Sequence, residues 1–98
     1  MNMQALMKQA QAMQKDMMNI KEELDNSTFE GSSSAVKVVV NGKKEIVSVK
    51  ILDDKDILDD LSILEDMIML AVNDAMKKVD AETEKKMGKY SNMMPGWM

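Results

Sequence analysis

Apolar residues recur at alternating steps of three and four between Met3 and Leu24, which is the pattern of a helix that lies against another helix. Strong helix formers occupy the other positions, and neither Gly nor Pro interrupts the segment. At about 1.5 Å per residue, this helix would be roughly 33 Å long, about the diameter of a small domain. We therefore expect part of it to pack on a second chain or to project into solvent. Its apolar seam comprises Met3, Leu6, Ala10, Met13, Met17, Ile20 and Leu24.

The spacing of apolar residues changes to a period of two after Ala35, which predicts a β-hairpin. Asn41-Gly42 favours a two-residue type I′ turn, in which both turn residues have positive φ. Such a turn would pair Val40 with Lys43 and place one apolar set on a single buried face of the sheet. Before the hairpin we expect a short strand at 28–30 and a flexible connection at 31–34. The predicted buried face comprises Val36, Val38, Val40, Val47, Val49 and Ile51.

A second long helix is predicted from Ile57 to about Met87, because apolar residues again recur at helical spacing. Five aspartates between positions 53 and 60 suit the start of this helix, since Asp side chains accept hydrogen bonds from free backbone N–H groups. A calcium loop is the less favoured interpretation, because the glycine and glutamate spacing of an EF-hand is missing. We expect residues 1–98 to form a single domain with a flexible tail from about residue 91.

Composition and charge narrow the classes of function. Basic residues number 13 and acidic residues 17, so the formal net charge is −4, and any contact with DNA phosphates must be local. All the basic residues are Lys, which cannot make the planar two-pronged contact of Arg with guanine. Cys and His are absent, which removes disulfides, imidazole catalysis and the commonest transition-metal ligands. Without a signal peptide or an apolar run of 18 residues, the sequence predicts a soluble cytoplasmic protein with no membrane partner, no metal and no cofactor.

Two groups of polar residues are candidates for contact with double-stranded DNA. One group forms a stripe on the first helix, on the face away from the apolar seam, where a merely solvated surface is the alternative. The other group lies toward the end of the second helix, where lysines also stabilise a helix C-terminus without any partner. The predicted DNA-binding residues are Gln4, Lys8, Gln11, Lys15, Lys78, Lys85, Lys86 and Lys89.

Several segments resemble one known family. The segment Leu-Met-Lys-Gln-Ala-Gln-Ala-Met-Gln-Lys at 6–15 is similar to the opening signature of the YbaB/EbfC family of bacterial nucleoid-associated proteins. Similar segments follow in the family's order over nearly the whole chain: Val-Lys-Val at 36–38, Val-Asn-Gly at 40–42, the acidic junction at 53–60, Val-Asn-Asp-Ala at 72–75, Lys-Met at 86–87 and Met-Pro-Gly at 94–96.

The resemblance implies an α+β fold with a long N-terminal helix, a small antiparallel sheet containing a β-hairpin, and a long C-terminal helix, assembled as a homodimer shaped like tweezers. It also implies a cytoplasmic protein of the nucleoid that binds double-stranded DNA with low sequence specificity and contributes to nucleoid organisation or gene regulation, without catalysis. The hairpin is short, the glycine-rich extension before the first helix is nearly missing, and the last helix has Lys where relatives often carry Arg. We therefore expect DNA binding that is weaker or less selective than in relatives.

Two further classes of function compete with DNA binding. Projecting Met-rich helices would also suit a protein-interaction module or co-chaperone that grips apolar segments of other proteins. An enzyme acting on a small-molecule substrate is the least favoured class, because no recognisable catalytic grouping is present. Two helices too long for one small core favour self-association as a homodimer. The predicted dimer interface comprises Met3, Leu6, Ala10, Met13, Met17, Val36, Val38 and Val40.

Overall fold

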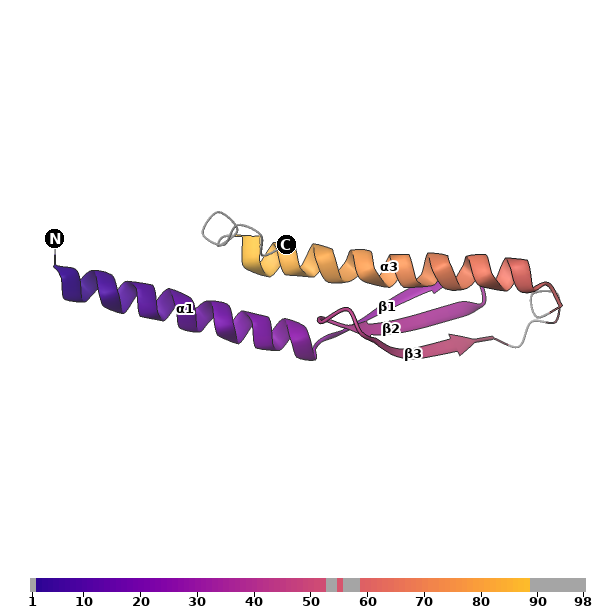
Figure 1. The fold of residues 1–98 in the computed structure, drawn as a ribbon, viewed down its shortest axis with the longest axis horizontal. Helices are drawn as coiled ribbons and strands as arrows, with labels where there is room; N and C mark the ends of the chain where they lie inside the picture. The colour runs from indigo at the N-terminus through magenta and orange to yellow at the C-terminus, as the bar shows by residue number, and fades with distance from the viewer. Residues whose placement is uncertain (1, 53–54, 56–58, 89–98) are drawn as a thin grey trace.

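The computed structural model describes residues 2–52, 55 and 59–88. Helix α1 (Met3–Asn26) is followed by strands β1 (Thr28–Ser33), β2 (Val36–Asn41) and β3 (Ile46–Ile51), and then by helix α3 (Leu61–Met87). The strands form one antiparallel sheet in the order β1-β2-β3. Helix α3 runs along the sheet, whereas α1 extends from its end, so the molecule is elongated, 69 × 20 × 15 Å (Figure 1). The α+β fold with two long helices is the predicted one.

The core lies between α3 and the first two strands. Ala71, Ala75 and Val79 lie one helical turn apart on α3, and their side chains are fully or almost fully buried against the valines of β2. The small alanine side chains let the helix approach the sheet closely, and the β-branched valines fit its pleated surface. The buried valines of β2 are Val36, Val38 and Val40.

Both helices begin at a capping side chain. The Asn2 carboxamide oxygen accepts from the N–H of Gln4, and the Asp60 carboxylate accepts from the N–H groups of Ser62 and Ile63. Such bonds satisfy donors that have no partner within the helix. Asp60 therefore confirms the helix-start interpretation of the acidic junction, while Asp53, Asp54, Asp56 and Ile57 lie outside the described residues, as does the tail from residue 91.

The hairpin differs from the predicted type I′ turn. The structure pairs Val40 with Ile46 and Val36 with Ile51, with a register shift between Val39 and Val40, so the predicted pairing of Val40 with Lys43 is wrong. The Asn41 side chain explains the longer loop, because its oxygen accepts from the N–H groups of Lys43 and Glu45 while its nitrogen donates to the Glu45 carboxylate. Positive φ in this loop falls on Lys44, at 64°.

The segment at 31–34 was expected to be a flexible connection, but β1 continues to Ser33. Gly31 pairs with Val38 and is buried beneath α3. A Cβ atom at position 31 would overlap the backbone of Ala71 and Ala75, so glycine is needed here for close approach and not for flexibility. The chain then turns at Ser34, where φ is 47°.

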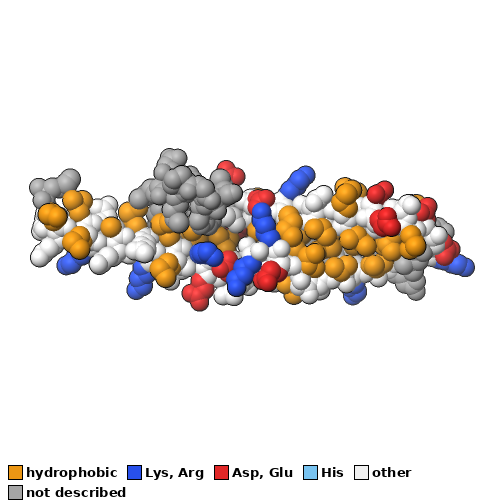
Figure 2. Space-filling model, viewed as in Figure 1, with side chains coloured by type: hydrophobic (Ala, Val, Ile, Leu, Met, Phe, Trp, Pro, Cys, Tyr) orange, Lys and Arg blue, Asp and Glu red, His pale blue; other side chains and the backbone are white. Residues whose placement is uncertain are grey.

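Strand β3 is not covered by α3. Its pairing places Val49 opposite Val38 and Ile51 opposite Val36, on the predicted face, whereas the register shift places Ile46 opposite Val40. Val47 lies on the same side of β3 as Val49 and Ile51 by alternation along the strand, and these three side chains are 58%, 48% and 39% exposed. The expected single buried face is therefore only partly buried, because α3 packs over β1 and β2. An apolar surface remains open over this half of the molecule (Figure 2). We call Val47, Val49 and Ile51, together with the exposed Met69 of α3, the β3 face.

Burial of the β2 valines against α3 excludes them from the predicted dimer interface. Val36, Val38 and Val40 have no exposed surface in the single chain, because they form its core against α3. A second chain could not reach them without unpacking that core, so their prediction as interface residues is wrong. Met3, Leu6 and Ala10 are exposed on α1, and Met13 and Met17 are half-buried near Leu24 and Met87.

Candidate nucleic-acid interface

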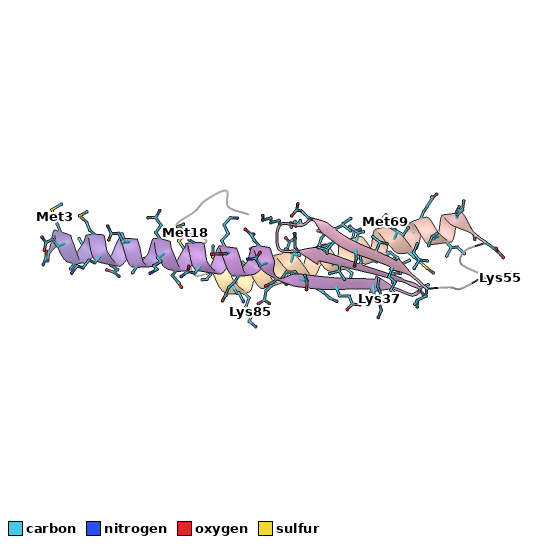
Figure 3. The ribbon with its side chains drawn as sticks, turned by 90° about the horizontal axis from the view of Figure 1, so that it is seen from below. Met3, Met18, Lys37, Lys55, Met69 and Lys85 are labelled. Carbon is cyan, nitrogen blue, oxygen red and sulfur yellow. The ribbon has the colours of Figure 1, made fainter. Side chains whose placement is uncertain are left out.

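The first half of α1 projects from the body of the molecule. Every residue from 3 to 12 is exposed, whereas the apolar contacts of α1 lie in its second half, where Leu24 and Met87 are buried together. In Figure 3 the helix extends far beyond the sheet, with Met3 near its free end. We call residues 3–15 of α1 the arm.

The arm carries only positive charge. It contains Lys8 and Lys15, and the first carboxylate of the chain is that of Asp16. The rest of the chain therefore accounts for all 17 acidic residues of a protein whose net charge is −4. Long-range repulsion of DNA by the body and local attraction by the arm are compatible, because screening limits charge interactions to about 8–10 Å in cell-like salt. This separation of a positive arm from an acidic body is visible in the order of the residues, although the net charge of the whole chain does not reveal it.

The predicted polar stripe lies on this arm. Gln4, Lys8, Gln11 and Lys15 are all exposed, and helical spacing places them opposite the side on which Leu24 is buried. Within the described part of the chain, neither Lys8 nor Lys15 forms an ion pair. Lys8 and Lys15 are separated by about 10 Å along the helix axis, so the two ammonium groups can reach separate phosphates.

Lys78 is held against the sheet. Its Nζ atom donates to the backbone carbonyl oxygen of Glu30 at 2.6 Å and lies 3.6 Å from the Asp74 carboxylate. Asp74 in turn accepts from the N–H of Ser32 at 3.1 Å. The structure thus gives Lys78 a role in attaching α3 to β1.

The lysines near the end of α3 lie in different surroundings. The Nζ atom of Lys86 is 3.7 Å from the Glu23 carboxylate of α1 and 3.8 Å from that of Glu82. Lys85 is exposed and points away from α1 and the sheet (Figure 3). Lys89 lies outside the described residues. The eight predicted residues therefore do not form one patch: four share the arm, Lys78 and Lys86 are paired with carboxylates, and Lys85 stands apart.

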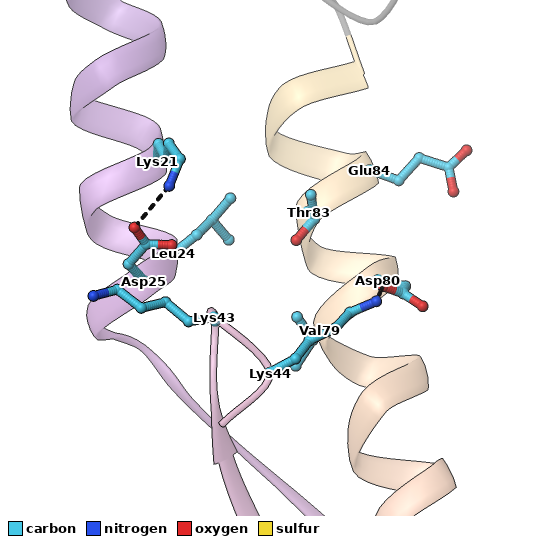
Figure 4. Close-up of a pocket in the computed structure, with 10 residues that line it drawn as sticks. Lys21, Leu24, Asp25, Lys43, Lys44, Val79, Asp80, Thr83 and Glu84 are labelled. Carbon is cyan, nitrogen blue, oxygen red and sulfur yellow. Dashed lines mark hydrogen bonds and ion pairs between the residues drawn. The ribbon is translucent and has the colours of Figure 1, made fainter. Parts of the chain in front are cut away.

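A cleft of about 650 Å³ lies where α1, the hairpin and α3 meet (Figure 4). Two ion pairs occupy its rim, Lys21 with Asp25 at 3.0 Å and Lys44 with Asp80 at 2.7 Å. In these two ion pairs the lysines and aspartates neutralise one another, so most of the charged side chains around the cleft are not available to bind an ionic ligand.

Across residues 2–52, 55 and 59–88, no group of three or more Asp and Glu side chains is arranged to hold a metal ion. Neither helix in that part of the chain is long and apolar enough to span a membrane.

Comparison with known proteins gives one consistent result. The model of the YbaB/EbfC DNA-binding family matches residues 1–94. A protein of Ligilactobacillus salivarius named nucleoid-associated protein is 42% identical over 98 residues, covering 98% of this chain and 94% of that protein. One of the same name from Pelotomaculum thermopropionicum is 46% identical over 96 residues, covering 92% and 88%. A crystal structure of an uncharacterized protein from Helicobacter pylori superposes with a TM-score of 0.69 at 26% identity, covering 97% of this chain and 99% of that one.

Proposed function

The chain belongs to the YbaB/EbfC DNA-binding family, and we propose that it binds double-stranded DNA through the arm, as a nucleoid-associated protein of the cytoplasm. Lys8 and Lys15 would neutralise phosphates, and Gln4 and Gln11 would add hydrogen bonds to the sugar-phosphate backbone. Binding of this kind has little sequence preference, because base edges are not read and no Arg is available for guanine. Such a protein would contribute to nucleoid organisation or gene regulation without catalysis.

The observation that supports this proposal most is the charge of the arm. It is the projecting part of the molecule, all of its residues except Met13 are exposed, and it contains two lysines and no carboxylate. Lys85 would be a secondary contact, whereas the predicted contacts of Lys78 and Lys86 would require their present ion pairs to open. Lys89, which lies outside the described residues, stays a predicted contact.

A salt titration with duplex DNA tests the proposal. We expect wild-type protein to bind at low salt, with log affinity falling linearly against log salt concentration, by about 0.9 for each phosphate engaged. The double variant Lys8→Ala, Lys15→Ala should bind more weakly, with a shallower slope. Lys77→Ala removes one exposed lysine of α3 and, compared with Lys8→Ala or Lys15→Ala alone, serves as the control for the loss of one charge outside the arm. No binding by the wild type at low salt, or equal slopes for the double variant and the wild type, would refute the arm as the DNA contact.

We also propose that the protein is a homodimer. The exposed β3 face and the exposed seam residues Met3, Leu6 and Ala10 are apolar surfaces that a second chain would remove from water. Strand β3 is an edge strand, so its free backbone groups are also available to another chain. The alternative of a co-chaperone that grips other proteins is not favoured by the family.

A further inference from the structure

Helix α1 is attached to the body of the molecule at its C-terminal end. Leu24 is buried against Met87 of α3, and the Glu23 carboxylate lies 3.7 Å from Nζ of Lys86. The third contact comes from the hairpin, whose Gly42 lies directly against the last turns of α1. We call these three contacts the joint.

Gly42 makes the tightest contact of the joint. A Cβ atom at this position would overlap the carbonyl group of Leu24 and would lie 2.9 Å from the backbone nitrogen of Asp25. The atoms in the way belong to the backbone of a helix, so no side-chain rotation can relieve the overlap. Any side chain at position 42 therefore forces the hairpin and α1 apart.

The hairpin is the better anchored of the two. The Asn41 side chain bonds to Lys43 and Glu45, and Lys44 forms an ion pair with Asp80 of α3 at 2.7 Å (Figure 4). By contrast, residues 3–12 of α1 are exposed throughout. The overlap that a side chain at position 42 would create is therefore relieved by a rotation of α1, while the hairpin keeps its position.

The length of α1 amplifies such a rotation. Lys8 lies 16 residues before Leu24, about 24 Å along the helix. A rotation of about 10° at the joint would displace Lys8 by about 4 Å, more than the length of a hydrogen bond to a phosphate. The direction of the arm thus depends on a residue that lies outside the arm, in the hairpin.

We propose that Gly42 is a positioning residue that sets the direction of the arm, and that its consequence for affinity rests on the proposed DNA binding. The glycine is required because its backbone supports α1 at van der Waals distance, which a residue with a side chain would increase. Two roles are thereby divided between two elements: the stripe of Gln4, Lys8, Gln11 and Lys15 on α1 contacts DNA, and Gly42 of the hairpin sets the direction of that stripe.

Spin-label distances test the proposal directly. The chain has no cysteine, so Met7→Cys on the arm and Leu70→Cys on α3 provide two unique exposed label sites. Labelled protein is diluted with unlabelled protein, so that only distances within one chain are measured by double electron–electron resonance. Adding Gly42→Ala should shift the mean distance by several ångströms, whereas adding Gly88→Ala should not, because a Cβ at position 88 meets no atom within 4 Å.

A second variant keeps the test decisive if Gly42→Ala does not fold. Lys44→Ala releases the hairpin from Asp80 and should broaden the distance distribution without a new overlap. Distributions equal to that of the wild type in every folded variant would overturn the positioning role.

DNA titration then separates this inference from the proposed function. A moved arm with at least a several-fold weaker affinity and a shallower salt slope supports the proposal, and a moved arm with unchanged affinity and slope refutes the link between direction and binding. If the wild type binds no DNA, the proposed function fails, while the distance measurement still decides whether Gly42 positions the arm.

Discussion

The Nζ atom of Lys78 donates to the backbone carbonyl of Glu30 at 2.6 Å, across 48 positions of sequence. Together, this hydrogen bond and the one from the Ser32 N–H to the Asp74 carboxylate cover the outer edge of β1 with side chains of α3. Asp74 and Lys78 are one helical turn apart and 3.6 Å from each other. One edge of the sheet is thereby closed to other strands, while the β3 edge is left open.

Replacement of Lys78 should affect stability more than DNA binding. Lys78→Ala removes the bond to Glu30 and leaves Asp74 without its cation, and we expect a loss of about 0.5–1.5 kcal/mol in the free energy of unfolding, a modest value because both side chains are partly exposed. Chemical denaturation measures it. A large loss of DNA affinity at unchanged stability would instead identify Lys78 as a phosphate contact.

Gly31 should tolerate no side chain. In Gly31→Ala the new Cβ overlaps the backbone of Ala71 and lies 2.8 Å from Cα of Ala75, so α3 must move away from β1. We expect the free energy of unfolding to fall by about 1–3 kcal/mol. Urea unfolding of this variant beside Gly88→Ala tests the expectation, which a stability equal to that of the control would contradict.

The two neighbouring aspartates before α3 should differ in their effect. Asp60→Ala removes the acceptor for the N–H groups of Ser62 and Ile63 and should cost about 0.5–2 kcal/mol. Asp59→Ala changes a nearby exposed carboxylate that does not cap the helix and should be close to neutral. Thermal unfolding of the pair measures the difference, and equal shifts would show that charge near the helix start matters more than the cap.

The β3 face should govern self-association. Val49→Glu places a carboxylate on this face, and we expect the mass measured by light scattering to fall from that of two chains to that of one, 11.0 kDa. Leu70→Glu makes the same change at a similarly exposed residue of α3, on the side that carries Asp74, and should leave the dimer intact. A Val49→Glu protein that remains dimeric would move the interface to the seam of α1, and a monomeric wild type would refute the dimer.

Periodicity predicted the two helices well, because their spacing is local information. The helix expected from Met3 to Leu24 ends at Asn26, and the second helix ends at Met87 as expected. The predicted start of the second helix at Ile57 is wrong, because α3 begins at Leu61, directly after the Asp60 cap. The sequence could not predict the hairpin register, since the Asn41 side chain competes with the two-residue turn that Asn-Gly favours. It also could not show that Gly31 lies beneath α3, because that contact joins segments about 40 residues apart.

The candidate site was predicted in part for a similar reason. The stripe on the arm follows from spacing alone, and the structure leaves it exposed. The lysines of α3 were grouped by their position near the end of the helix, but that position says nothing of neighbouring elements. The Glu23 carboxylate of α1 contacts Lys86, and the backbone carbonyl of Glu30 in β1 accepts from Lys78. Charged groups are assigned to partners by tertiary structure, which one helix cannot reveal.

The exposure of residues 3–12 has a consequence for order as well as for charge. With no buried side chain, these first turns depend on local helix propensity and on the Asn2 cap, and helices shorter than about 12–15 residues are marginal in water when isolated. We expect their amide hydrogens to exchange quickly in the free protein and slowly once a polyanion is bound. Part of the binding free energy would then be used to complete a helix, so affinity should weaken as temperature unwinds those turns.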